Sequence, residues 1–120
     1  MIRKRPEEDL HRQVADYLSL AIVPPAWWTT FPSGWFRGKA AAGILKACGL
    51  KAGVPDILLI RDGRVYWIEL KAEGGYLSAA QKEMRPLLLA AGCQHVICRS
   101  IGEIQSALLM WGFRLKARAA

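Results

Sequence analysis

The sequence lacks several features that would place it in a membrane or a secreted scaffold. No apolar run reaches the roughly 18 to 20 residues that span a bilayer, and no apolar signal core follows the basic start, MIRKRPEEDLHRQ. Only three cysteines are present, Cys48, Cys93 and Cys98, and none forms a CxxC pair. Their pattern favours reduced core thiols over a disulfide framework or a zinc site. We therefore expect a cytoplasmic protein that does not enter a membrane, with residues 1–120 forming a single domain.

Acidic residues are scarce relative to basic ones. The 120 residues include 17 Lys and Arg but only 10 Asp and Glu, which gives a formal net charge of +7. This excess favours a polyanionic partner, nucleic acid above all. Small proteins are also often basic for solubility alone, so the charge by itself leaves both interpretations open.

The spacing of apolar residues predicts an α/β protein. Helical spacing from Leu10 to Leu18, after Pro6 and an acidic first turn, predicts a helix over 6–21 that Pro24 and Pro25 end. Further along, β-forming residues and turn signals alternate with helical patterns. The predicted elements are a short strand at 26–32, a weaker helix at 37–48, strands at 54–60 and 64–71, a helix at 78–91, a buried strand at 94–100 and a last helix at 101–111.

The strands at 54–60 and 64–71 read as a hairpin, because Asp62-Gly63 is a strong two-residue turn. That turn pairs Arg61 with Arg64, and each later pair follows in the same register. Asp56 then faces Glu69 directly across the hairpin. Lys71, two residues beyond Glu69, lies on the same side of its strand.

Two facing carboxylates are costly in this setting. Both faces of the hairpin are otherwise apolar, so we expect central strands that are covered on both sides. A divalent metal would compensate the repulsion between Asp56 and Glu69. The alternative is a solvated ion cluster at the end of the sheet, in which Lys71 neutralises one acid, and the pairing alone does not decide between them.

Gly53-Val54-Pro55-Asp56 followed by Ile68-Glu69-Leu70-Lys71 resembles the PD-(D/E)XK nuclease signature, and the whole chain resembles the VRR-NUC family, the virus-type replication-repair nucleases. The order and spacing of the two motifs on a hairpin make the similarity specific. Ser33-Gly34 departs from the Asn-Gly expected in relatives. The other matching positions are Glu7 and Leu10, Gly34, Arg37, Gly49, Leu77-Ser78 with Gln81, and Gly92.

The resemblance implies a fold and a metal site. The fold would be a restriction-endonuclease-like core, a mixed central sheet flanked by helices in the order α-β-β-β-α-β. Asp56, Glu69 and the backbone carbonyl of Leu70 would ligate Mg²⁺ or Mn²⁺, which prefer oxygen ligands. Lys71 would hold the attacking water and stabilise charge on the phosphate.

Two further residues have competing roles. The resemblance makes Glu7 the third acid and metal ligand, whereas its position also suits the positive end of the helix dipole, as do Glu8 and Asp9. It places Gln81 in the catalytic site, whereas Ser78-Ala79-Ala80-Gln81 also reads as a capping box.

The implied function is a metal-dependent DNA endonuclease of a bacterial or phage-infected cell, selective for branched DNA and similar to Holliday-junction resolvases. Such an enzyme would be a homodimer. The alternatives are a non-catalytic DNA-binding module on the nuclease fold, or a nonspecific nuclease or ribonuclease. Four basic residues between the aromatic segment and the site are candidates for holding phosphates, namely Arg37, Lys39, Lys46 and Lys51. Large aromatic residues would fill either the core or the dimer interface, namely Trp27, Trp28, Trp35, Phe36 and Trp111.

Overall fold

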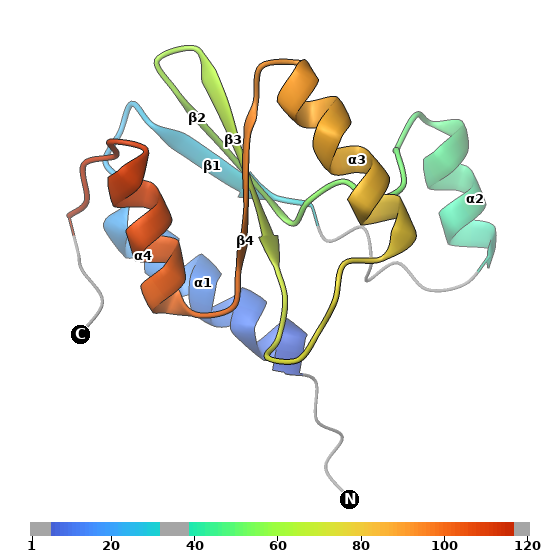
Figure 1. Cartoon of the computed structure of the whole chain (residues 1–120), viewed down its shortest axis with the longest axis horizontal. Coiled ribbons are helices and arrows are strands. Elements are labelled where there is room, and N and C mark those ends of the chain that lie inside the picture. The colour runs from blue at the N-terminus through green and yellow to red at the C-terminus, as the bar shows by residue number, and fades with distance from the viewer. Residues whose placement is uncertain (1–5, 32–38, 117–120) are drawn as a thin grey trace, which may run out of the picture.

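The computed structural model describes residues 6–31 and 39–116 (Figure 1). Arg37, Trp35, Phe36 and the Ser33-Gly34 turn lie outside these residues, so the predictions made for them stay predictions. The described elements are α1 (Pro6–Ala21), β1 (Trp27–Thr30), α2 (Lys39–Ala47), β2 (Ile57–Arg61), β3 (Arg64–Leu70), α3 (Ala79–Ala90), β4 (Gln94–Cys98) and α4 (Ile101–Met110).

The four strands form one mixed sheet in the order β1-β2-β3-β4. β1, β2 and β3 pair antiparallel, and β4 runs parallel to β3. The β2–β3 register is the predicted one, from Arg61 opposite Arg64 to Ile57 opposite Ile68. Asp62 and Gly63 both have positive φ, as a tight two-residue hairpin turn requires. The central position of β2 and β3 and the α/β fold class are therefore confirmed.

The bounds of β2 differ from the prediction. The strand begins at Ile57 rather than at residue 54. Pro55 has no backbone N–H to contribute to a ladder. Asp56 follows it, and its side chain rather than its backbone accepts the bond from the Leu70 N–H. The chain thus enters the sheet one residue after the carboxylate.

One face of the sheet, here called the core face, is fully covered. Alternate residues of β2 and β3 point to it, and Ile57, Leu59 and Ile68 are completely buried there. They form one cluster with α1 and α4, to which Leu18 and Leu108 contribute. Figure 1 shows these two helices together on one side of the sheet.

The opposite face, here called the site face, is less covered, which corrects the prediction that the strands are covered on both sides. Leu58 and Trp67 are only half-buried there, and Ile60 is exposed. α3 packs against β4 on the site face. β4 is an edge strand in which only Cys98 is buried, so the prediction of a buried strand was also wrong.

Local sequence signals explain most of the helix boundaries. α1 has the predicted bounds, and α3 begins after the N-cap Ser78 with both bonds of a capping box. α2 lies within the predicted range but buries no residue. Cys48, which follows it, is exposed rather than in the core, while Cys98 is buried. Within the described part of the chain, no helix is both long enough and apolar enough to cross a bilayer.

Candidate functional site

The candidate site lies where β2 begins and β3 ends. Register places Asp56 opposite Glu69, and the two carboxyl groups interact directly. The Leu70 N–H donates to Asp56 Oδ2 at 2.8 Å, which fixes the Asp56 side chain. The backbone of Asp56 is also held in place, because the Phe31 N–H donates to the Asp56 backbone carbonyl at 2.7 Å. The predicted juxtaposition of the two acids is therefore present in the fold.

Burial makes both acids hard to ionise, and repulsion by Asp56 adds to this effect for Glu69. Glu69 is 1% exposed. Burial, and next the Asp56 charge, raise the pKa of Glu69 to about 8. Burial also raises the pKa of Asp56, although its bond from the Leu70 N–H opposes the shift. In the metal-free protein the pair therefore holds a proton near neutral pH that two ordinary carboxyls would have lost.

Lys71 joins the acids from the end of β3. It is 8% exposed, and its Nζ lies 3.9 Å from Glu69 Oε1. Glu7 of α1 lies on its other side, with Oε1 at 4.0 Å from the same Nζ. Glu7 thus reaches the site, where the structure places it beside the lysine.

Gln81 makes both of the contacts that the sequence suggested as alternatives. Its side-chain oxygen accepts from the Ser78 N–H at 2.8 Å, and the Ser78 hydroxyl accepts from the Gln81 N–H at 3.2 Å. Its Nε2 meanwhile donates to Glu69 Oε1 at 2.7 Å. An amide has a separate donor and acceptor, so the two roles are compatible.

Gly53 explains how α3 comes so close to the acids. Its φ is +82°, and a Cβ at this position would overlap the Ala80 carbonyl. Only glycine allows the loop before Asp56 to pack backbone-to-backbone against the first turn of α3. That packing brings Gln81 to the end of β3.

His11 is a site residue that sequence reasoning missed. It lies one helical turn after Glu7 and is 5% exposed. Burial lowers its pKa, while the charges of Asp56 and Glu7 oppose that shift, so it lies within electrostatic reach of both. The i, i+4 spacing from Glu7 was the available signal, because it places both side chains on one face of a helix.

The donor set fits a hard divalent cation. Glu69 Oε2 is buried and has no hydrogen-bond partner among the described residues. An orphaned buried carboxylate oxygen beside a second carboxylate suits a cation with oxygen ligands. Among the described residues no three His, Cys, Asp or Glu side chains converge, so Glu7 and the Leu70 carbonyl stay predicted ligands.

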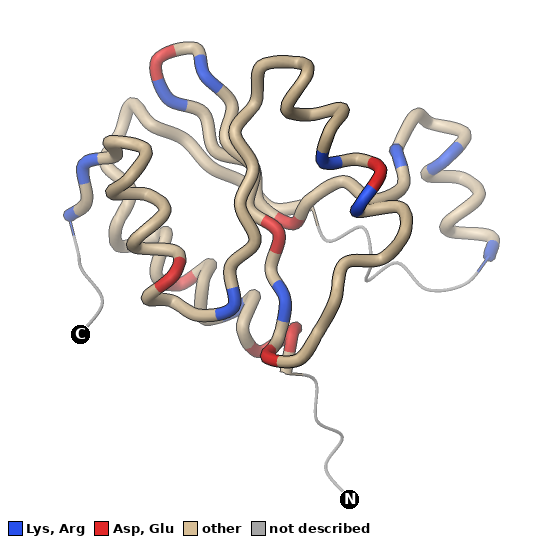
Figure 2. Tube along the Cα trace, viewed as in Figure 1, with Lys and Arg blue, Asp and Glu red and all other residues tan. Residues whose placement is uncertain are grey.

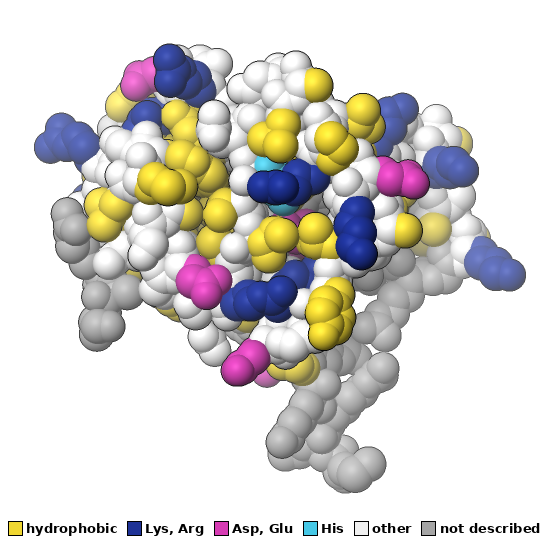
Figure 3. All heavy atoms as spheres, in the orientation of Figure 1, with side chains coloured by type: hydrophobic (Ala, Val, Ile, Leu, Met, Phe, Trp, Pro, Cys, Tyr) yellow, Lys and Arg dark blue, Asp and Glu magenta, His cyan; other side chains and the backbone are white. Residues whose placement is uncertain are grey.

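Figure 2 shows basic residues in several parts of the described chain, and two of these regions are candidates for binding phosphates. Lys39 and Lys46 of α2 and the following Lys51 are exposed, and their predicted contacts with phosphates remain predictions. The second region was missed by sequence reasoning and lies around the site face. Figure 3 shows basic and apolar side chains gathered over α3 and β4. The basic residues of this second region are Lys82, Arg85 and Arg99.

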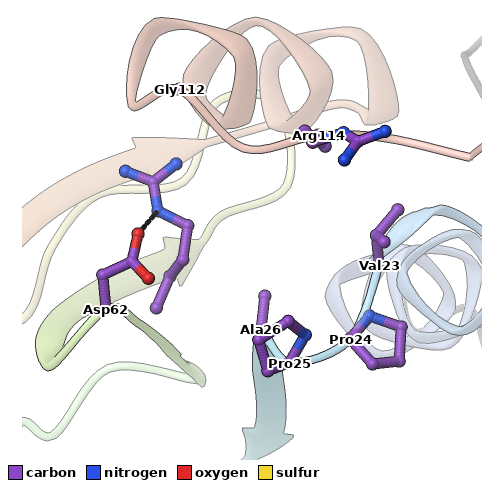
Figure 4. Close-up of a pocket in the computed structure, with 8 residues that line it drawn as sticks. Val23, Pro24, Pro25, Ala26, Asp62, Gly112 and Arg114 are labelled. Carbon is purple, nitrogen blue, oxygen red and sulfur yellow. Dashed lines mark ion pairs between the residues drawn. The ribbon is translucent and has the colours of Figure 1, made fainter.

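A separate hollow lies at the other end of the hairpin (Figure 4). Its volume is about 370 Å³, and Arg61 and Arg114 are among its lining residues. Arg61 Nη2 donates to the Trp111 carbonyl at 2.7 Å and to the Tyr66 hydroxyl at 3.1 Å, and its guanidinium stacks on Phe113. Through these contacts Arg61 packs against the edge of the core, at the end of the hairpin away from the acids.

No family model matches the chain, and no curated protein matches it in sequence. A solved structure described as a "VRR_NUC domain protein" matches it in three dimensions, with a TM-score of 0.72 and 21% sequence identity. The match covers 92% of this chain and 91% of the other. The chain therefore shares the fold of this VRR-NUC domain protein, a mixed sheet flanked by helices, as the sequence predicted.

Proposed function

We propose that the protein is a nuclease that hydrolyses phosphodiester bonds in DNA with Mg²⁺ or Mn²⁺. One observation carries the proposal: the half-buried Asp56 faces the buried Glu69, with Lys71 within 4 Å of Glu69, at one end of the site face. Two facing carboxyl groups, one of them buried, cost the fold stability, which supports a role for the pair in binding a cation. The VRR-NUC fold supports the same reading.

The roles follow from the contacts. Asp56 and Glu69 would hold the cation, which supplies a more acidic bound water and polarises the phosphodiester. Lys71 is close enough to the acids to position that water and to stabilise charge developing on the phosphate. Gln81 fixes the Glu69 carboxylate through its bond to Oε1. Glu7 orients Lys71 from α1.

The decisive experiment is a cleavage panel. Plasmid, single-stranded, flap and four-way-junction DNA, and RNA, are each incubated with Mg²⁺, Mn²⁺ or EDTA. We expect metal-dependent cleavage of DNA, fastest on branched forms, and none with Lys71→Ala. Binding of DNA without cleavage under every condition would instead identify a non-catalytic module, and preferential cleavage of RNA would identify a ribonuclease.

We further propose a homodimer, because symmetric cleavage of a junction needs two sites related by a two-fold axis. α2 and α3 bury no residue within the described fold. Each exposes a large apolar side chain, Ile44 of α2 at 65% and Leu87 of α3 at 64%, which a partner subunit would cover. Of the tryptophans predicted for the interface, Trp111 packs 4.9 Å from the Tyr66 ring and Trp28 packs against the core, while Trp27 is exposed. The α2 and α3 faces are thus better interface candidates than Trp28 or Trp111.

Sedimentation at micromolar concentration tests the assembly. We expect a dimer for the wild type and a monomer for the double variant Ile44→Lys, Leu87→Lys, with Leu20→Lys on α1 as the matched control. A wild-type monomer that cuts linear and branched DNA equally would exclude the resolvase-like function and leave a general nuclease.

A further inference from the structure

Among the tryptophans of the described chain, Trp67 and the exposed Trp27 do not pack against the core cluster, and Trp67 is the nearer of the two to the acids. Trp28 and Trp111 both pack against the buried cluster of the core face. Trp67 points to the site face, is half-buried, and contacts the Phe31 ring with centroids 5.8 Å apart. A large aromatic residue that is only half-covered therefore lies beside the acids without a role in the main core.

The position of Trp67 relative to the acids is fixed by the sheet. It precedes Glu69 by two residues on β3, so their side chains lie on one face, about 7 Å apart along the strand. Phe31 is equally close to the site, because its N–H binds the Asp56 carbonyl. The two rings therefore adjoin the place where a phosphodiester would meet Asp56 and Glu69.

Polar donors flank the rings on the β4 side. His95 is the ladder partner of Trp67, and Arg85 of α3 donates its Nε–H to His95 Nδ1 at 3.2 Å. Burial, and next the Arg85 charge, lower the pKa of His95, which keeps the imidazole neutral. Arg85 is exposed and offers its remaining guanidinium N–H groups to an anion.

We propose that the Trp67 surface, made of Phe31, Trp67, His95 and Arg85, binds an unpaired nucleotide next to the cleaved phosphodiester. The base stacks on Trp67, and the adjoining phosphate is bound by Arg85. A base inside a duplex is stacked on both sides and cannot reach Trp67. The surface thus selects strands with an unstacked nucleotide at the cut, such as branch points, flaps and single strands. This inference rests on the proposed function and supplies its substrate selectivity.

The test measures binding in EDTA, where no cleavage is required. The probes are labelled oligothymidylate of about twelve nucleotides, within the 4 to 16 that a single-strand groove holds, a base-free sugar-phosphate oligonucleotide of equal length, and the matching duplex. We expect the wild type to bind oligothymidylate about 5- to 150-fold more tightly than the base-free probe, the range that stacking of one base gives. Its tryptophan emission should be quenched on binding.

Two substitutions locate the effect. Trp67→Ala should lose most of the preference for oligothymidylate and keep its affinity for the base-free probe and the duplex. Trp67→Phe should keep the preference, because a phenyl ring still stacks, but lose the quenching. Trp27→Ala is the matched control, since Trp27 is 56% exposed and lies at the turn end of the same face. Arg85→Gln should weaken both single-stranded probes equally.

Equal affinity of the wild type for oligothymidylate and the base-free probe would overturn the inference. So would quenching that persists in Trp67→Phe, because another tryptophan would then carry the contact. If Trp67→Ala does not fold, two other measurements test the inference. They are the preference of the wild type for oligothymidylate over the base-free probe, and the loss of fluorescence quenching in Trp67→Phe. If the wild type prefers oligothymidylate but cleaves nothing in the DNA panel, the proposed nuclease activity is refuted, while nucleotide binding by the Trp67 surface still stands. Cleavage with no base preference would refute the surface alone.

Discussion

The core face and the site face are made by the same strands, yet they differ in cover and in chemistry. On the core face, Leu59 and Ile68 are completely buried under α1 and α4. On the site face, Leu58 is half-buried, and the strand ends carry Asp56 and the 1% exposed Glu69. Because alternate residues of a strand point to opposite faces, the same hairpin places its stabilising apolar residues on one face and its acids on the other.

The largest effect should come from breaking the chemistry of the site face. Asp56→Ala, Glu69→Ala and Lys71→Ala should each lower the cleavage rate by at least about 100-fold, because the two acids would hold the cation and Lys71 would stabilise charge on the reacting phosphate. Single-turnover rates with Mn²⁺ measure the loss, and circular dichroism checks folding. Full activity of Lys71→Ala would refute the mechanism.

The neighbours Leu58 and Leu59 provide a matched test of the two faces. Leu59→Ala should destabilise the protein by about 2 to 5 kcal/mol, because it opens a cavity in a closed core. Leu58→Ala should cost clearly less, because its side chain is already half in solvent. Urea denaturation measures both free energies of unfolding. Equal losses would mean that the site face is as well packed as the core face.

The protonation of Glu69 predicts an unusual pH dependence. Its pKa is raised from 4.5 to about 8 on folding, so between these values the folded state holds a proton that the unfolded state has lost. The contribution of Glu69 to metal-free stability should therefore be complete below about pH 4.5 and be lost, by at most about 1.4 kcal/mol per pH unit, as the pH rises to about 8. Denaturation across this range measures the slope.

Two variants separate this effect from others. Glu69→Gln should flatten the slope, because it removes the titrating carboxyl while keeping an Oε1 for Gln81. Mn²⁺ should stabilise the wild type at pH 8 and have little effect at pH 5, where Glu69 stays protonated. A wild-type slope unchanged by Glu69→Gln would assign the titration to another group.

The smallest effect concerns the start of α3. Ser78→Ala and Gln81→Ala should each cost about 1 kcal/mol, because both break the capping box. Only Gln81→Ala also removes the bond to Glu69 Oε1, so it should lower cleavage more than Ser78→Ala does. Thermal melts and cleavage rates on the same two variants test this, and equal rates would leave Gln81 with a capping role alone.

Much of the site was predictable because its geometry is local to one hairpin. The Asp62-Gly63 turn fixes the register, and the register places Asp56 opposite Glu69. The capping box at Ser78 and Gln81 is equally local. His11, the Gln81 bond to Glu69 and the uneven cover were beyond prediction, because each depends on elements far apart in the sequence.

The sequence by itself determined the turn and the strand register, because a two-residue loop allows only one register for the two strands. The register in turn places the two acids opposite each other and Lys71 on the same side. Only the tertiary structure decided which face of the hairpin is open. It also set the raised pKa of Glu69 and the place of His11 beside Asp56. These properties arise from burial by α1, α3 and α4, and the hydrophobic pattern of a strand that is apolar on both faces does not say which helices will cover it.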